Sequence, residues 1–382
     1  MAIKKIRALH LVKTSKGASW ALRQVRELVK LGVEVHIALP PGPLVSEYQQ
    51  AGAIVHLVSL DFPVREPWRW PRLFKEVRNL VIRIHPDIIH SHHVGTTVTM
   101  RLGLRGLKIP RIFQVPGPLH LEHPVFRSLE IALANKHDYW IGSCKYTCDL
   151  YKRFGVKEDR IFLSYYGVDL ENFAGRQGRL REFLGIGKDV KLVGMVAYMY
   201  APKWFLGQTR GLKGHEDFID AIKLATLRRK DLMAVIIGGA WDKAWYEEKI
   251  RDYAQKRCGA YITLLGTRSD VPDLYPDLDV AVHPSHSENV GGAVESLLFG
   301  IPTIATRVGG LPEVVIDGVT GWLVPPKKPA LLATTILEVL QDLDKGREMA
   351  KRGQALVRQL FDVKKTAAEV AHIYEQLLSR NP

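Results

Sequence analysis

The chain has 382 residues, of which 46% are apolar and 25% charged, and its net charge is +14, a balance typical of soluble globular proteins and not of disordered or fibrous ones. No run reaches the roughly 18 apolar residues of a membrane-spanning helix, and the apolar run after the basic start is too short for a secretion signal, so we expect a cytoplasmic protein. The three cysteines show no CxxC spacing, which argues against a disulfide framework or a zinc site.

The positive charge is concentrated in the first half of the chain. Residues 1–185 contain 28 Lys and Arg against 16 Asp and Glu, and the remainder contains 26 against 24. This asymmetry favours an anionic partner for the first half, either a membrane surface or a phosphorylated acceptor, although a solvated basic face explains it equally well. Nucleic acid is disfavoured because no basic stretch carries the interleaved aromatic residues of RNA-binding modules.

Short apolar runs alternate with helical patterns along the whole chain. This alternation predicts parallel sheets with helices on both faces. The first series of runs lies at residues 7–12, 34–39, 54–58, 87–91, 111–115 and 139–144, and the second at 191–196, 233–239, 262–266, 280–285, 303–306 and 321–324.

A polar, glycine-containing stretch at residues 170–190 separates the two series. We therefore predict an α/β protein with two doubly wound Rossmann-like domains, at residues 1–180 and 181–362. A C-terminal helix at 363–382 is expected to pack back on the first domain. Ligands of such sheets bind beyond the carboxyl ends of the strands, so a site between the two domains is expected.

A predicted helix at residues 71–84 has an apolar stripe at helical spacing and five basic residues on or just before it. The segment REPWRWP precedes it at residues 65–71. An amphipathic helix with Trp and Arg at its start can lie on an anionic bilayer. The alternative, which we favour, is that the apolar stripe packs on the sheet.

The segment SHSENVGGAVESLLFGIPTIAT at residues 285–306 indicates a ligand site. Two carboxylates, Glu288 and Glu295, flank the pair Gly291–Gly292 ahead of a predicted helix. Glycine allows a ligand to approach bare backbone, and the free N–H groups of a helix start favour an anion. We expect a polar, phosphorylated ligand here.

A second cationic position precedes another predicted helix. Arg210 and Lys213 stand just before HEDFIDAI, after an unusually long loop. Cations and free helix N–H groups together suit a diphosphate. The chain contains neither GxxxxGK[ST] nor GxGxxG, so nothing supports an ATPase or a dehydrogenase.

Several motifs together resemble the family-4 retaining glycosyltransferases of the GT-B fold (glycosyl transferases group 1). The donor-binding signature of that family is similar to residues 280–326. The motifs PDIIHSH, YYGVDLENF, GLKGHEDFIDAI and TLLGTRSDVPDLYPDLDVAVHPS also occur in the order typical of the family. The resemblance covers nearly the whole chain and implies a GT-B fold, with an acceptor-binding first domain and a nucleotide-sugar-binding second domain.

The resemblance also implies roles for individual residues. Glu288 would contact the hydroxyls of the donor sugar and Glu295 the ribose hydroxyls, since a carboxylate accepts charge-assisted hydrogen bonds from vicinal hydroxyls. Lys213 would neutralise the diphosphate. The loop amides that would face the sugar and the phosphate are those of Asn289, Val290, Gly291 and Gly292.

Two features depart from the family pattern. Six residues separate the two glutamates, where the family has seven. Either the loop is one residue shorter or Ser287 takes the place of the first glutamate, and we favour the shorter loop because Glu288 retains the carboxylate. The family arginine that directly follows the strand is missing, so its role passes to Arg210 or Lys203, of which we favour Arg210.

The remaining implied positions are spread over both domains. Gly17 would approach the phosphates, and Thr267 and Arg268 would flank the base. In QVPGPLHLEHP, His120 would lie near the anomeric carbon of the sugar, with an ordinary loop histidine as the alternative. The HSHH segment at residues 90–93 invites a metal assignment, but no carboxylate or cysteine stands nearby to complete a site. We expect cleft-lining or core histidines and no metal.

The resemblance therefore implies a metal-independent, retaining hexosyltransferase with Lys213, Arg210, Glu288 and His120 as its catalytic residues. It needs no cofactor beyond the sugar donor, a UDP- or GDP-linked sugar. The acceptor would be an anionic or lipid-linked saccharide in cell-surface polysaccharide or glycolipid synthesis, reached by peripheral contact with the inner membrane face. Two alternatives stay open: a sugar-nucleotide epimerase of the same architecture, and a non-catalytic basic membrane-binding protein.

Overall fold

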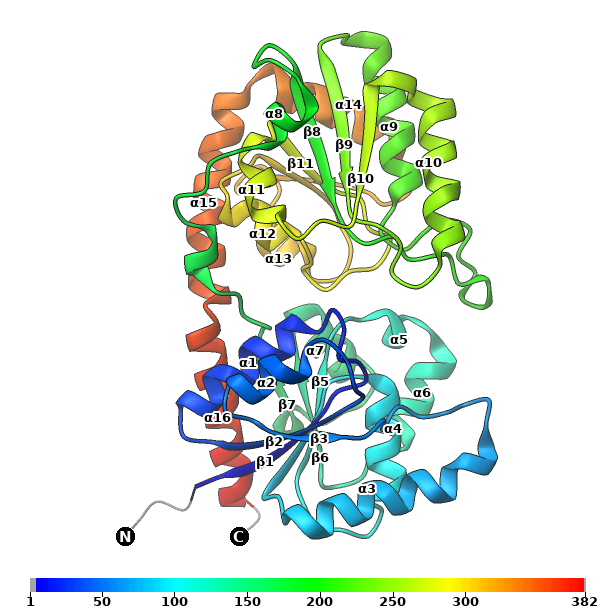
Figure 1. The fold of residues 1–382 in the computed structure, drawn as a ribbon, viewed down its shortest axis with the longest axis vertical. Coiled ribbons are helices and arrows are strands. Elements are labelled where there is room, and N and C mark those ends of the chain that lie inside the picture. Colours follow the sequence, from blue (N-terminus) through cyan, green and yellow to red (C-terminus); the bar gives the residue numbers. More distant parts are fainter. Residues whose placement is uncertain (1–4, 381–382) are drawn as a thin grey trace. The chain divides into compact units, whose positions relative to one another are not determined.

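The computed structural model describes residues 5–380. Its contacts divide the chain into two compact units, residues 1–169 with 360–382 (unit 1) and residues 170–359 (unit 2). Figure 1 shows that each unit is built around its own sheet with helices on both faces. The boundaries at 180/181 and 362/363 that the sequence suggests remain a prediction.

Unit 1 contains a parallel seven-stranded sheet in the order β3-β2-β1-β4-β5-β6-β7. Each strand coincides with an apolar run of the first series or lies in the segment before the linker. The strands are β1 (Arg7–Leu11), β2 (Glu34–Leu39), β3 (Ile54–Leu57), β4 (Ile88–Ser91), β5 (Arg111–Val115), β6 (Asp138–Gly142) and β7 (Ile161–Leu163). The helices are α1 (Ser19–Lys30), α2 (Val45–Gln50), α3 (Trp70–Ile84), α4 (Val94–Gly103), α5 (Leu119–Glu122), α6 (Pro124–Ala132), α7 (Lys145–Arg153) and α16 (Val363–Arg380).

Unit 2 contains a parallel six-stranded sheet in the order β10-β9-β8-β11-β12-β13. Its strands are β8 (Lys191–Val196), β9 (Leu232–Ile237), β10 (Ile262–Gly266), β11 (Val280–His283), β12 (Thr303–Thr306) and β13 (Trp322–Val324). Its helices are α8 (Leu180–Leu184), α9 (His215–Arg228), α10 (Ala244–Cys258), α11 (Val271–Leu274), α12 (Ala293–Leu298), α13 (Leu311–Val314), α14 (Pro329–Gln341) and α15 (Leu343–Phe361), the last ending in unit 1. The prediction of two doubly wound α/β domains is confirmed.

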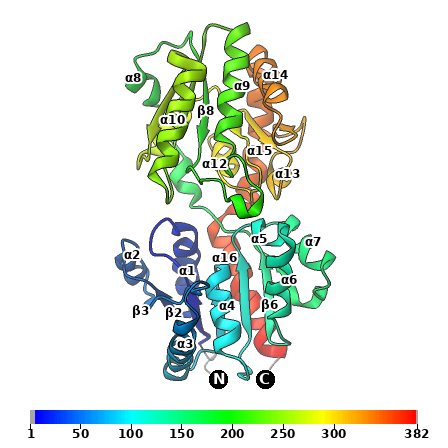
Figure 2. The same cartoon turned by 90° about the vertical axis from the view of Figure 1, so that its right-hand side faces the viewer.

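The C-terminal helix α16 completes the core of unit 1. Its apolar face, which includes Ala367, Val370 and Leu377, lies in one buried cluster with residues of β1, β2 and α1. Figure 2 shows α16 beside the sheet of unit 1. The last helix of the chain thus packs on the domain formed by its first residues.

The helix predicted at residues 71–84 is α3, and its apolar stripe packs on the sheet. Leu73, Val77, Leu80 and Ile84 belong to a buried cluster that also contains residues of β1 and β4. The packing interpretation of this stripe is therefore correct. The opposite, basic side of α3 is exposed, and no described helix is long and apolar enough to cross a bilayer.

A candidate donor-binding site in unit 2

The two predicted chemical positions of unit 2 meet at an ion pair. Lys213 Nζ contacts a carboxylate oxygen of Glu288, 75 residues further along the chain. Only 19% of the Lys213 side chain and 12% of the Glu288 side chain are exposed. Parallel strands end at the same edge of a sheet, so the loops after β8 and β11 come together there.

Backbone contacts hold these two loops against each other. The His286 N–H donates to the Leu212 carbonyl at 2.8 Å. Gly214, with φ of 75°, lies so close to the Pro284 carbonyl that a Cβ at this position would be 2.0 Å from the oxygen. Only glycine therefore fits at the start of α9, directly after Lys213.

The Glu288 carboxylate has further partners besides Lys213. It accepts hydrogen bonds from the Asn289 N–H at 3.0 Å and from Ser285 Oγ at 3.2 Å. Burial alone would raise the pKa of Glu288, but the Lys213 charge and these hydrogen bonds outweigh it and lower the pKa below its ordinary value. Glu288 is thus an anion at neutral pH.

Two glycines bring bare backbone next to Glu288. A Cβ on Gly291, which has φ of 47°, would lie 2.7 Å from the carboxylate carbon of Glu288, and one on Gly309 would lie 1.7 Å from its backbone oxygen. The Gly291–Gly292 turn was expected from the sequence. Gly309, which comes from the loop after β12, was not, although the GG pair in RVGG is a detectable signal.

The structure does not pair Arg210 with the carboxylate that binds Lys213. Its guanidinium contacts Asp217 at 2.5 Å and Asp220 at 2.8 Å, both on α9. Asp217 in turn binds His286 Nε2 at 2.5 Å, which links Arg210 to the Glu288 loop through two side chains. Lys203, the alternative, is exposed. The role of either cation remains a prediction.

An aromatic side chain, Tyr200, flanks the ion pair. Lys213 Nζ lies 5.8 Å from the centroid of the Tyr200 ring, and burial, followed by the charge of Glu288, raises the pKa of Tyr200 to about 12. Met199 forms an isolated bridge with Ala240, so this loop is joined to the one after β9. Tyr200 was not expected from the sequence.

The other predicted positions of unit 2 lie at the same edge of the sheet. Thr267 and Arg268 follow β10, where Thr267 is adjacent to Gly239 and Arg268 forms a bidentate pair with Asp270. Glu295 is half-buried in the first turn of α12. Burial, followed by the Glu295 charge, raises the pKa of Tyr275. The predicted roles of all three remain untested.

Two predicted residues belong to unit 1. Gly17 has φ of 70° in the loop between β1 and α1. His120 is half-buried in α5, with Nε2 at 3.4 Å from the Tyr151 hydroxyl, and burial lowers its pKa. A neutral imidazole can donate one hydrogen bond and accept another.

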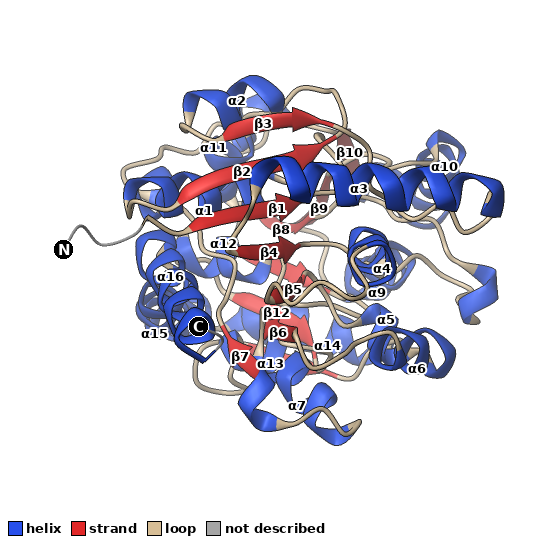
Figure 3. Ribbon diagram, turned by 90° about the horizontal axis from the view of Figure 1, so that it is seen from below, coloured by secondary structure: helices blue, strands red, loops and turns tan. Residues whose placement is uncertain are grey.

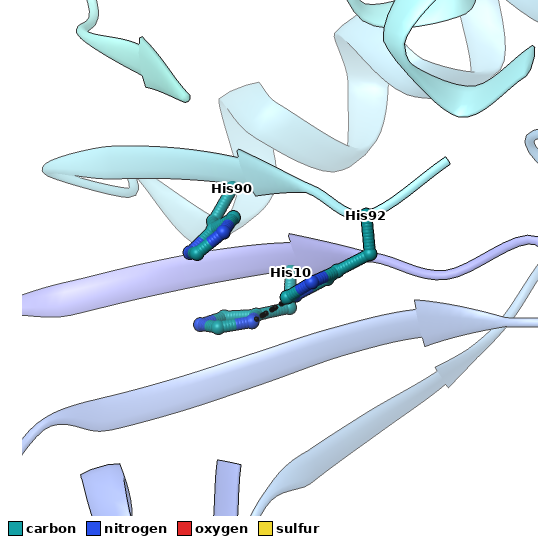
Figure 4. A group of neighbouring side chains, drawn as sticks. All are labelled: His10, His90 and His92. Carbon is teal, nitrogen blue, oxygen red and sulfur yellow. Dashed lines mark hydrogen bonds between the residues drawn. The ribbon is translucent and has the colours of Figure 1, made fainter. Parts of the chain in front are cut away.

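The HSHH segment contributes to a buried histidine cluster. Figure 4 shows His10 on β1, His90 on β4 and His92 directly after β4. One ring nitrogen from each of the three lies within 4.8 Å of the other two. The His90 and His92 rings stack with their centroids 4.3 Å apart. His10 Nδ1 and His92 Nε2 are 2.8 Å apart.

Hydrogen bonds to two tyrosines complete the histidine cluster. Tyr374 of α16 contacts His90 Nδ1 at 2.6 Å and His10 Nε2 at 3.1 Å, and Tyr166 contacts His92 Nδ1 at 2.8 Å. Burial lowers the pKa of His10 to about 3 and that of the other two well below the ordinary value. We interpret the cluster as a neutral polar network of the core. His90 and His92 are fully buried, which agrees with a core position, and the absence of a metal remains a prediction.

Two family models match the chain. "Glycosyltransferase Family 4" matches residues 17–172 and "Glycosyl transferases group 1" matches residues 204–356. Together they cover residues 17–172 of the predicted first domain and every candidate residue of the second except Lys203.

Curated relatives lead to the same family. A D-inositol 3-phosphate glycosyltransferase of Arthrobacter sp. is 29% identical over 393 residues, covering 91% of this chain and 86% of the relative. One of Xylanimonas cellulosilytica is 30% identical over 246 residues, covering 61% of this chain. The chain spans about half, 55%, of the length of that second relative.

Solved structures match over nearly the whole chain. Anabaena HepE in complex with UDP and glucose aligns with a TM-score of 0.82 at 20% identity, covering 97% of this chain and all of that one. Sucrose-phosphate synthase from Thermosynechococcus elongatus aligns with a TM-score of 0.80 at 18% identity, covering 99% and 100%. With both halves matched by the family models and the whole fold by these structures, the chain belongs to the family-4 glycosyltransferases of the GT-B fold.

Proposed function

We propose that the protein transfers a hexose from a nucleoside-diphosphate sugar to an acceptor hydroxyl with retention of configuration. The observation that carries this proposal is the enclosed Lys213–Glu288 pair at the carboxyl edge of the unit 2 sheet. The fixed cation suits the diphosphate of the donor, and the fixed carboxylate beside it suits a hydroxyl of the donor sugar. UDP is the favoured nucleotide because HepE, a protein of the same fold, is described in complex with UDP and glucose.

In the proposed reaction the bond between the anomeric carbon and the diphosphate oxygen breaks while a bond to the acceptor oxygen forms on the same face. The acceptor proton passes to the departing phosphate oxygen. Lys213 stabilises the negative charge that grows on the diphosphate, and Glu288 orients the sugar through its hydroxyls. Glu295 would bind the ribose. Because Lys213 supplies the positive charge, we propose that no metal ion is needed.

Product analysis with a panel of sugar nucleotides tests this function. We expect one UDP- or GDP-sugar to release its nucleoside diphosphate in the presence of a saccharide acceptor, and the release to persist in EDTA. The anomeric configuration of the product, read by NMR, reports retention. Release that is lost in EDTA would contradict metal independence, and conversion of the donor to its 2-epimer without acceptor would indicate an epimerase instead.

We further propose that the acceptor is lipid-linked and that unit 1 contacts the inner face of an anionic membrane. Supporting this, Trp68 and Val64, in the segment that leads into α3, are 72% and 74% exposed. Exposed aromatic and basic residues together favour the membrane interface. Sedimentation with vesicles containing phosphatidylglycerol should show binding that Trp68→Ala weakens, while Trp245→Ala in unit 2, where Trp245 is 52% exposed, leaves it unchanged. Equal effects of both variants would contradict the proposal.

A further inference from the structure

A charged groove runs between the edge strand β3 and helix α3 of unit 1. It measures about 570 Å³. Figure 3 shows β3 as the outermost strand of the unit 1 sheet and α3 beside the same half of that sheet. Residues 55–58 form one wall, and α3 forms the other through Arg72, Lys75, Glu76, Asn79, Leu80 and Arg83. These helix residues recur at spacings of three and four, so they form one continuous stripe beside the buried apolar one.

Three cations of this stripe have no carboxylate partner in the part of the chain that the structure describes. No ion pair involves Arg72, Lys75 or Arg83 within residues 5–380, whereas neighbouring cations are paired, for example Arg69 with Glu66 at 2.9 Å. Glu76 is the one acidic residue that lines the groove, and it forms no ion pair in this part of the chain. The groove therefore carries an excess of positive charge that the described protein does not neutralise.

The walls of the groove are held in place. On the strand side, His56 is fixed by a 2.9 Å hydrogen bond to His36, which in turn contacts Glu34. On the helix side, Leu73, Val77 and Leu80 anchor α3 in the core. A rigid backbone keeps the three cations on one line, with flexible side chains that can converge on a bound group.

We propose that this groove is a binding site for a phosphate ester. Uncompensated Arg and Lys side chains in a groove are the groups that bind phosphate, the former in bidentate fashion. Leu57, which lines the groove and is 60% exposed, gives the site an apolar rim. The phosphate could belong to a phospholipid headgroup or to a soluble compound, since the chemistry is the same. The site deepens the proposed membrane contact but does not depend on sugar transfer.

Two binding measurements on the 382-residue chain distinguish a phospholipid headgroup from a soluble phosphate compound. One arm titrates inorganic pyrophosphate by calorimetry into protein that also carries Lys213→Ala, so that the proposed diphosphate site of unit 2 does not contribute. The other arm measures sedimentation with phosphatidylcholine vesicles containing phosphatidylglycerol. The test variant is Arg72→Gln/Lys75→Gln/Arg83→Gln. The matched control, Lys108→Gln/Lys136→Gln/Lys157→Gln, removes the same charge from exposed positions elsewhere on unit 1. We expect the groove variant to lose at least tenfold in affinity and the control less than twofold.

A variant that is expected to bind more strongly separates the proposal from misfolding, because a misfolded protein would lose binding. Glu76→Gln removes the acidic charge of the groove and should strengthen phosphate binding several-fold, whereas Asp159→Asn, a matched change on an exposed part of unit 1, should not. Binding to both probes would indicate that phosphate alone suffices, and binding to vesicles alone would assign a lipid headgroup. Equal losses in the groove and control variants, or no gain from Glu76→Gln, would overturn the proposal. Pyrophosphate binding that depends on the groove, without binding to the vesicles, would contradict the membrane contact only.

Discussion

At the scale of single residues, the Lys213–Glu288 pair has a dual character. It stabilises unit 2 as an ion pair, and in the proposed reaction each partner also meets the donor. Glu288 already accepts hydrogen bonds from Asn289 and Ser285, so its carboxylate is oriented before a ligand arrives. Preorganised charge of this kind costs little reorganisation in a transition state.

Lys213→Ala should lower kcat by on the order of 10²-fold or more, because Lys213 would face a charge that grows as the glycosidic bond breaks. Steady-state kinetics with the identified donor, together with thermal melting to verify folding, measure this effect. Lys249→Ala is the control, since Lys249 is an exposed cation of α10 and is not a candidate site residue. A near-normal kcat for Lys213→Ala would mean that the donor site is misplaced.

Glu295→Ala should behave differently from Lys213→Ala. Ribose carries no developing charge, so its hydrogen bonds to Glu295 would be equally strong in the ground state and in the transition state. Removal of the Glu295 carboxylate should therefore raise the donor KM and leave kcat within a few fold of the wild-type value. The same kinetic assay separates the two parameters. An unchanged donor KM would remove Glu295 from the ribose site.

The ion pair also makes a pH-dependent contribution to stability. The folded-state pKa of Glu288 lies below the ordinary value of 4.5, so the stabilisation is complete above about pH 4.5 and disappears as the pH falls through the folded pKa. Thermal melting of the wild type and of Glu288→Gln from pH 7 to pH 3 should show a difference in Tm that is largest at neutral pH and shrinks below pH 4.5. A difference that grows towards low pH would contradict this assignment.

At the scale of elements, the site depends on how closely the loops after β8 and β11 approach. The contact of Gly214 with the Pro284 carbonyl sets this distance. Gly207 lies in the same long loop with a similar φ of 68°, but nothing lies within 4 Å of its missing Cβ. Comparing alanine substitutions at Gly207 and Gly214 therefore separates the cost of backbone strain from the cost of a steric clash.

Gly207→Ala should cost only the left-handed strain of an L-residue, roughly 1–2 kcal/mol. Gly214→Ala should cost this strain and also force the two loops apart, so we expect a clearly larger drop in Tm together with a loss of activity. Thermal melting and the donor-release assay report the two effects. Equal Tm values for the two variants would show that the loops adapt without cost.

At the scale of the whole molecule, the two ends of the chain are joined by hydrogen bonds in the core of unit 1. Tyr374 of α16 contacts His90 and His10, which lie 284 and 364 residues away. These side chains are fully buried. Removing the tyrosine hydroxyl would leave buried imidazole nitrogens without a partner, which is costly in a low-dielectric core.

Tyr374→Phe should lower the free energy of unfolding by roughly 1–3 kcal/mol. Tyr48→Phe is a matched control, because Tyr48 is also fully buried but its hydroxyl has no hydrogen-bond partner among the described residues. That change should be neutral or stabilising. Chemical denaturation of both variants provides the comparison, and equal destabilisation would contradict the role of the histidine–tyrosine network.

The sequence by itself determined the strands other than β7, their parallel arrangement and the two segments that carry Lys213 and Glu288. That these segments bind the donor remains a prediction. These features depend on local patterns, namely apolar runs, glycine positions and motif order, which can be read without coordinates. The apolar stripe of α3 was also readable from its spacing, and packing on the sheet was the favoured of two interpretations that the structure then decided.

Only the tertiary structure decided which side chains are neighbours. The sequence places Arg210 in a loop predicted to bind phosphate, but its guanidinium forms ion pairs with Asp217 and Asp220 of α9. His10 meets His92, and Tyr200 meets Lys213. Three cations of α3 line the groove beside β3 without an ion-pair partner among the described residues. The reason is physical: in a parallel sheet, strands far apart in sequence end at one edge, so the partners of a side chain are set by strand order and loop path and not by its own neighbours in the chain.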